Sequence, residues 1–235
     1  MKRTGPLLTG ISLCLALFAP SLAQQDPLRP DASPPAGTPR QIAPVMSFLG
    51  ADWLIRPERE QEEKPDLVVE ALRIPRGATV IDLGAGVGYF TWRLAKHVGP
   101  EGRVIATDVQ PEMLAMLRRN MRARGIRNFE SVLVTQTDAR LPAETGAELA
   151  LLVDVYHELS HPALTMRQVL RALKPGGRVV LVEYRQEDPS LPIHPLHKMS
   201  VEGAREEIEP VGFEFVEVLD FLPSQHIIVF RRPAQ

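Results

Sequence analysis

The fold of this chain is decided by one segment, Val80-Ile81-Asp82-Leu83-Gly84-Ala85-Gly86-Val87-Gly88-Tyr89-Phe90. Apolar residues lead into three glycines at alternate positions, and an amphipathic stretch that extends to Val98 follows them. This order predicts a buried strand, a tight turn and the start of a helix. Glycine permits a positive φ and leaves room for a ligand, which the free N–H groups at the helix start then face. The same pattern also fits a tight turn that binds nothing, so the rest of the chain has to decide.

Length and composition predict one α/β domain of a soluble globular protein. The chain has 235 residues, of which 44% are hydrophobic and 24% are charged, the usual balance of that class. Its formal net charge of -2 gives no electrostatic footprint for DNA or RNA, so we expect no nucleic-acid partner. Five arginines between residues 118 and 127 follow a helical pattern and are interpreted as a solvated face. No pattern indicates an oligomeric state.

The first 23 residues have the pattern of a secretory signal peptide. Lys2 and Arg3 precede a mostly apolar run over residues 7–19, and small residues stand before Gln24. The run is short and interrupted by polar residues, so we expect no stable membrane span in the mature chain. Residues 24–45 are rich in proline and are expected to form an extended linker. The folded domain is then expected to cover residues 46–235.

A signal peptide predicts that the protein is exported to the periplasm or cell envelope. The alternative is that translation starts at Met46, where the folded domain is expected to begin, and that the protein is cytoplasmic. The only cysteine, Cys14, lies in the leader. We therefore expect no disulfide, thiolate metal site or cysteine nucleophile in the mature chain.

Strand and helix patterns alternate after the glycine segment. Strands are expected over residues 80–83, 103–108, 129–135, 148–153 and 178–184, and helices over 88–98, 111–124, 163–173 and 200–211. Two late strands, 213–219 and 227–230, have no helix between them and are expected to form an antiparallel edge pair. The sequence thus predicts a doubly wound, mainly parallel seven-stranded sheet of the Rossmann-like type. Ligands of such sheets lie beyond the carboxyl ends of the strands, where the strand order reverses.

The glycine spacing argues against two common phosphate sites. Tyr89 occupies the place of the third glycine in a dinucleotide fingerprint, and no Lys-Ser or Lys-Thr pair follows as in a phosphate loop. Asp82 would repel a phosphate and suits a cationic group better. Asp108, at the end of the next strand, can accept two hydrogen bonds from vicinal ribose hydroxyls. The pattern therefore favours a nucleoside ligand that carries a positive charge.

Five segments in order resemble the class I S-adenosylmethionine-dependent methyltransferases. They are residues 80–88, 104–108, 137–139, 151–157 and 170–178. The resemblance covers about residues 50–235 and is greatest to the small-molecule enzymes of the ubiquinone/menaquinone-biosynthesis type. It implies a Rossmann-like fold, S-adenosyl-L-methionine as cofactor and methyl transfer to a small-molecule acceptor.

The resemblance also implies contacts at the methionine end of the cofactor. Gly84, Gly86 and Gly88 would surround the methionine part. Asp82 would lie near its ammonium group, directly or through water. Asp154 would border the sulfonium and the acceptor.

At the nucleoside end, the resemblance assigns the residues after the second and third strands. Asp108 would bind the ribose hydroxyls, with Val109 or Gln110 beside the adenine. Asp138 and Ala139 would contact the adenine amine and ring.

The candidate catalytic residues follow the fourth strand and lie in the loop after the fifth. A general base assists methyl transfer when the acceptor is a hydroxyl or an acidic carbon, and histidine titrates near neutrality. His157 is therefore the first candidate and His197 the second, with Tyr156 beside them. The alternative is that they are hydrogen-bonding loop residues. The segment Asp154-Val155-Tyr156-His157 departs from the Asn/Asp-Pro-Pro-Tyr motif of the adenine-N6 members, which argues against that chemistry. Members that methylate arsenite need several cysteines, and the mature chain is expected to contain none.

Two other functions remain open. Residues 157–161, His-Glu-Leu-Ser-His, match the H-E-x-x-H pattern of zinc hydrolases, in which both histidines share one helix face. Pro162 disfavours helical backbone at His161, and a strand is expected just before His157. We therefore assign no metal ligand among the site residues. The second alternative is a module that binds S-adenosylmethionine without catalysis.

Overall fold

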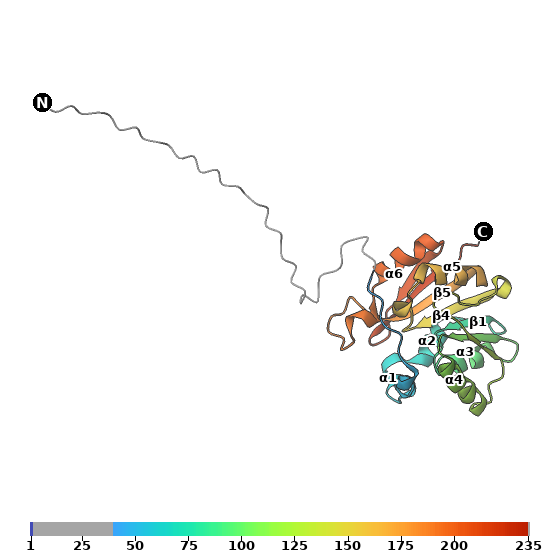
Figure 1. The fold of residues 1–235 in the computed structure, drawn as a ribbon. Helices are drawn as coiled ribbons and strands as arrows, with labels where there is room; N and C mark the ends of the chain where they lie inside the picture. Colours follow the sequence, from blue (N-terminus) through green and yellow to red (C-terminus); the bar gives the residue numbers. More distant parts are fainter. Residues whose placement is uncertain (2–39, 235) are drawn as a thin grey trace. The chain divides into compact units, whose positions relative to one another are not determined.

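A sheet of eight strands runs through the centre of the computed structural model (Figure 1). The model describes residue 1 and residues 40–234. The strand order is β3-β2-β1-β4-β5-β8-β7, and β6 pairs with β5 alone. The strands are β1 (Thr79–Leu83), β2 (Arg103–Asp108), β3 (Phe129–Leu133), β4 (Ala147–Val153), β5 (Leu173–Arg185), β6 (Lys198–Met199), β7 (Glu214–Leu219) and β8 (Gln225–Arg231).

Helices cover both faces of the sheet, as Figure 1 shows. Alternate residues of a strand point to opposite faces, so Ile81 packs with the helices α5 and α6 while its neighbour Val80 packs with α2 and α3. The prediction of a doubly wound sheet is therefore confirmed. The helices are α1 (Arg59–Glu63), α2 (Pro65–Ala71), α3 (Thr91–Val98), α4 (Pro111–Ala123), α5 (Pro162–Ala172) and α6 (Val201–Ile208), and a 3-10 segment η1 (Phe48–Ile55) precedes them.

All seven predicted strands form, and the predicted edge pair is confirmed. Strands β3, β2, β1, β4 and β5 are parallel, whereas β8 is antiparallel to both β5 and β7. The two-residue strand β6 was not predicted. It is short and depends on pairing with Tyr184 and Arg185 rather than on its own pattern. Before the sheet, Pro65 begins the second of two short helices, α1 and α2.

Two local predictions need correction. The strand predicted from residue 178 begins at Leu173, and residues 174–177 form its irregular start, because Gly176 and Gly177 exchange backbone hydrogen bonds with Arg232. The helix predicted from residue 88 begins only at Thr91. Gly88 has a φ of +86°, which a right-handed helix does not allow.

The compact unit that contains the sheet begins at Gln41. The expected signal peptide and residues 24–39 of the expected linker lie outside the described residues. Residues 41–45, which we also assigned to the linker, belong to the compact unit. Ala43 is 2% exposed, and its N–H donates to the carbonyl oxygen of His157 at 3.2 Å. This contact brings the start of the unit to the end of the sheet where a ligand is expected.

No helix within residues 40–234 combines the length and the apolar character needed to cross a membrane.

Gly88 is required by packing between the glycine turn and α4. A Cβ at this position would lie 2.8 Å from Met121 Cε and 3.0 Å from Leu117 Cγ. We expect Gly88→Ala to lower the free energy of unfolding by roughly 2–5 kcal/mol, through left-handed backbone strain and overpacking. Gly125, with a φ of +69° and nothing within 4 Å of the added Cβ, provides the matched control.

Denaturant titration of both variants measures the packing contribution. Gly125→Ala carries only the backbone term of about 1–2 kcal/mol. Equal losses in the two variants would show that packing against α4 contributes nothing.

Candidate functional site

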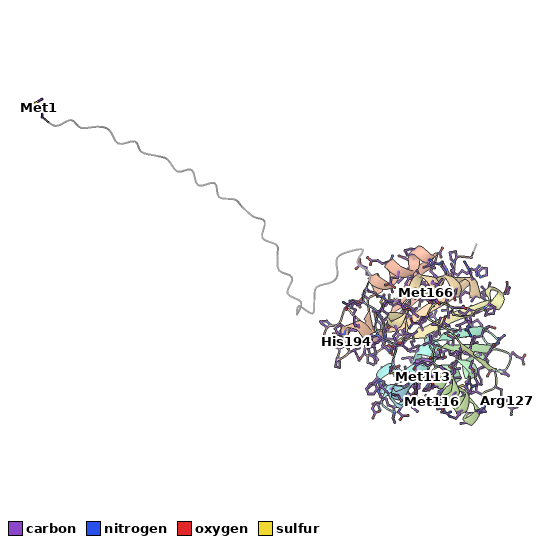
Figure 2. The ribbon with its side chains drawn as sticks, in the orientation of Figure 1. Met1, Met113, Met116, Arg127, Met166 and His194 are labelled. Carbon is purple, nitrogen blue, oxygen red and sulfur yellow. The ribbon has the colours of Figure 1, made fainter. Side chains whose placement is uncertain are left out.

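A cavity of about 540 Å³ opens at the carboxyl ends of β1, β2 and β4. It lies where the strand order reverses, since β1 is flanked by β2 on one side and β4 on the other. This is the place where doubly wound sheets bind ligands. Met113 and His194, both labelled in Figure 2, belong to its wall, together with residues of η1 and α1.

The glycine turn and Asp108 form one corner of the cavity. Gly84 and Gly86 line it with φ values of +73° and +53°. Gly86 N–H donates to Asp108 Oδ2 at 2.9 Å, and Gln110 N–H donates to Oδ1 at 2.8 Å. Burial raises the pKa of Asp108, although these backbone hydrogen bonds oppose the rise. Each carboxylate oxygen has a second lone pair, so Asp108 can still accept hydrogen bonds from a ligand.

Residues 43–48, which we call the N-terminal strap, connect this corner to the opposite wall. Gln110 Nε2 donates to the carbonyl oxygen of Met46 at 2.9 Å, while Met46 N–H donates to Glu158 Oε1 at 3.2 Å. Ala43 N–H adds the bond to His157 described above. The strap therefore links the segment after β2 to the segment after β4 across the cavity.

Helix α1 and Asp154 bring opposite charges to a third wall. Arg59 Nε donates to Glu63 Oε1 at 2.7 Å, and both side chains are buried. Within the described residues, Glu63 Oε2 and Arg56 Nε are buried without a hydrogen-bond partner. Asp154 has a φ of +53° and accepts two 2.9 Å hydrogen bonds from Gln225 Nε2. Burial and the charges of Glu63 and Glu183 raise the pKa of Asp154 well above its ordinary value.

His157 forms the fourth wall together with His197. His157 Nδ1 lies 2.6 Å from Glu183 Oε2, and His157 Nε2 lies 3.1 Å from His197 Nδ1. Glu183 is fully buried on β5 and also accepts the N–H groups of Val155 and Tyr156. Burial lowers the pKa of His157, but the charge and hydrogen bond of Glu183 outweigh burial, so the pKa is raised. Burial and the charge of His157 lower the pKa of His197.

Nine of the predicted site residues line this cavity: Gly84, Gly86, Asp108, Val109, Gln110, Ala139, Asp154, His157 and His197. Four others do not line it: Asp82, Gly88, Asp138 and Tyr156. Their side chains or backbone serve other contacts. The structure therefore brings nine predicted residues, from both ends of the expected cofactor and from the histidine pair, to one cavity and places the other four away from its wall.

Each of the four has a physical reason for its place. Thr91 Oγ1 donates to Asp82 Oδ2 at 2.5 Å, which fastens β1 to the start of α3, and burial raises the pKa of Asp82 to about 6. Tyr156 Oη donates to Glu207 Oε2 at 3.0 Å, toward α6. Asp138 is exposed and accepts the N–H of Arg140, and Gly88 faces α4.

Three contributions to the site, those of η1, α1 and Glu183, were not predicted from the sequence. Arg59 and Glu63 stood in a run of charges, and only their spacing of four residues on a short helix marked them as a pair. Glu183 occupies a strand position among apolar residues. A charged residue at a buried strand position is almost always paired, so Glu183 could have been predicted to have a partner in the site.

The H-E-x-x-H arrangement of zinc hydrolases does not form. His157 lies in a 3-10 turn (Tyr156–Glu158), whereas α5 begins only at Pro162. His161 Nδ1 lies 3.0 Å from Ser160 Oγ instead of beside His157. The two histidines therefore do not share a helix face.

Comparison with known proteins agrees with this geometry. The ubiquinone/menaquinone biosynthesis C-methyltransferase UbiE of Idiomarina loihiensis is 31% identical over 118 residues, which are 49% of this chain and 46% of that protein. The arsenite methyltransferase of Halobacterium salinarum is 29% identical over 60% of this chain and 39% of its own length. The chain thus matches less than half the length of these relatives.

A solved structure and a family description complete the comparison. A SAM-dependent methyltransferase from Aquifex aeolicus has the same fold, with a TM-score of 0.74 and 23% identity over 79% of this chain and 98% of that one. Residues 74–218 match the family described as "Methyltransferase domain". This match covers more than half of the chain, which therefore belongs to the methyltransferase domain family.

Proposed function

We propose that this protein transfers a methyl group from S-adenosyl-L-methionine to a small-molecule acceptor. The observation that carries the proposal is that one cavity joins the glycine turn and Asp108 to the face formed by His157 and His197. The family supports methyl transfer, and the two relatives are named for a biosynthetic C-methylation and for methylation of arsenite. Both are activities on small molecules.

The residues around the cavity fit this cofactor. Gly84 and Gly86 bring bare backbone to the cavity wall, where a Cβ on Gly84 would lie 2.5 Å from Val155 Cγ2 and a Cβ on Gly86 would lie 3.0 Å from Leu54 Cδ1. Asp108 can receive the ribose hydroxyls on its remaining lone pairs. Glu63 Oε2 and Arg56 Nε lack partners, and they match the ammonium and carboxylate groups of an amino acid. When bound, the cofactor supplies a methyl group already activated by a positive sulfur.

The chain itself aligns the reactants and receives a proton. Holding donor and acceptor in line contributes up to about 7–11 kcal/mol in well-oriented systems. Asp154 and Glu63 bring negative charge to the cavity wall, which favours a cationic ligand. His157 and His197 face the same space, so an acceptor with an ionisable O–H, N–H or acidic C–H loses its proton on that side. Trp53, a wall residue like Ile193, favours an acceptor with apolar surface.

The proposal extends to location. We infer that the protein is exported to the periplasm or cell envelope, with residues 1–23 as its signal peptide. Residues 43–45 support this over a start at Met46, because Ala43 bonds to His157, and Pro44 and Val45 line the cavity. A chain that began at Met46 would lack all three contacts.

Asp108→Ala tests the cofactor contact. We expect it to weaken S-adenosylmethionine binding by about 1–3 kcal/mol, because charge-assisted hydrogen bonds to the ribose are lost. Isothermal titration calorimetry measures the change. Asp138→Ala is the control, since Asp138 does not line the cavity, and its affinity should stay within about twofold of the wild type. Equal affinity of Asp108→Ala and the wild type would contradict the ribose contact.

His157→Gln tests the acceptor side. We expect kcat to fall by about 10²–10⁴-fold, as for loss of a general base, while the affinity for S-adenosylmethionine stays unchanged. Release of S-adenosylhomocysteine is measured against a panel of phenols, quinols and lipids. His161→Gln, outside the cavity, should keep the wild-type rate. Wild-type turnover in His157→Gln would remove this histidine from the reaction.

Mass spectrometry of the native protein tests its location. A mature N-terminus near Gln24 is expected if the leader is cleaved. An N-terminus at Met46 would overturn the export proposal.

A further inference from the structure

Three potential metal ligands converge on the His157 side of the cavity. His157 and Glu158 follow β4, while His197 closes a 3-10 turn (Pro195–His197) before β6. One ligand atom from each lies within 4.8 Å of the others. The residues come from two loops, and the two histidines are 40 positions apart in the sequence. The fold rather than the local sequence therefore brings them together.

The distance between the two imidazoles suits a shared ion. His157 Nε2 and His197 Nδ1 are 3.1 Å apart. Two histidine nitrogens on one zinc ion, each at about 2.0–2.1 Å, lie about 3.0–3.4 Å from each other when the angle at the metal is roughly 95–110°. An N–H···N hydrogen bond has a similar length, so the distance alone does not separate the two arrangements.

Glu183 provides an independent indication. Its Oε2 lies 2.6 Å from His157 Nδ1, and the carboxylate is 0% exposed. A carboxylate in this position accepts the Nδ1–H proton, so in the neutral imidazole the lone pair is on Nε2, the atom that faces His197. A histidine that binds a metal almost always donates its other ring N–H to an acceptor of this kind, either a carboxylate, a backbone carbonyl or water. Glu183 thus prepares His157 as a ligand.

Glu158 completes the set. Its Oε1 accepts the N–H of Met46 in the N-terminal strap. This hydrogen bond fixes the position of the Glu158 carboxylate, and the residue lines the cavity. Two histidines and one glutamate are the ligands of several zinc sites that keep a fourth position open.

We propose that His157 Nε2, His197 Nδ1 and the Glu158 carboxylate bind one divalent transition-metal ion, of the zinc or cobalt class, with an open position toward the acceptor. The role of this ion in the reaction rests on the proposed function. The ion would bind an acceptor oxygen and lower the pKa of its O–H group, and the proton would leave to water. The oxygen lone pair then forms the O–C bond while the pair of the C–S bond stays on sulfur. When the ion is bound, Nε2 is occupied, so the ion rather than the imidazole promotes loss of the acceptor proton, and His157 acts in the reaction as a ligand.

The test measures metal binding directly and does not depend on turnover. Tag-free, chelator-treated full-length protein is titrated with Zn²⁺, bound metal is counted by mass spectrometry after gel filtration, and Co²⁺ is followed by visible absorption. We expect one equivalent of either ion in the wild type. His197→Ala, a half-buried loop residue, should lose stoichiometric binding. Glu183→Gln should raise the dissociation constant by about 10–100-fold, as for other residues that orient a ligand.

His161→Ala is the control, because it removes a histidine from the loop that carries His157 and Glu158 but not from the cluster, and it should bind one equivalent. Retention of one equivalent by His197→Ala, or no stoichiometric binding by the folded wild type, would overturn the metal site. S-adenosylmethionine affinity is measured on the same samples. Intact cofactor binding without metal binding overturns the metal site alone, whereas metal binding without cofactor binding overturns the proposed methyl transfer.

Discussion

The carboxylate of Asp108 is the constraint on which the site depends. It holds the N–H of Gly86 from the turn after β1 and the N–H of Gln110 from the start of α4. Gln110 in turn holds Met46, which bonds to Glu158 beyond β4. One chain of hydrogen bonds thus crosses the whole cavity. Because each link joins a backbone group to a buried or half-buried side chain, these bonds hold the glycine turn and the histidine face at one separation.

Charge distribution explains why this cavity suits a cationic ligand. Glu63, Asp154 and Glu158 line it, and burial raises the pKa of both Asp154 and Glu158. A buried carboxylate is costly unless a positive group or hydrogen bonds compensate it. Arg59 compensates part of this charge, since it is paired with Glu63. A ligand that carries an ammonium and a sulfonium would compensate the rest, so these carboxylates favour binding of the cofactor.

The sheet and much of the site could be predicted because they follow local patterns. The strand before Gly84 and the position of Asp108 at a strand end are visible in periodicity alone. Asp82 was placed at the ligand because it adjoins the glycines, yet it bonds to Thr91, and Gly88 faces α4. The Arg59–Glu63 pair, the role of Glu183 and the strap depend on contacts between distant segments. Periodicity does not encode such contacts, and the proline-rich neighbourhood of residues 41–45 concealed that Ala43 is buried.

A crystal structure of the full chain with S-adenosylhomocysteine tests the central claim most directly. The claim is that one cavity holds the methyl donor against Asp108 and directs its sulfur toward His157. We expect density for the ribose hydroxyls within hydrogen-bond distance of Asp108, the amino-acid end near Glu63 and Arg56, and the sulfur facing the histidine pair. Density for the nucleoside at any other place, or a cavity that stays empty at saturating ligand, would contradict the account.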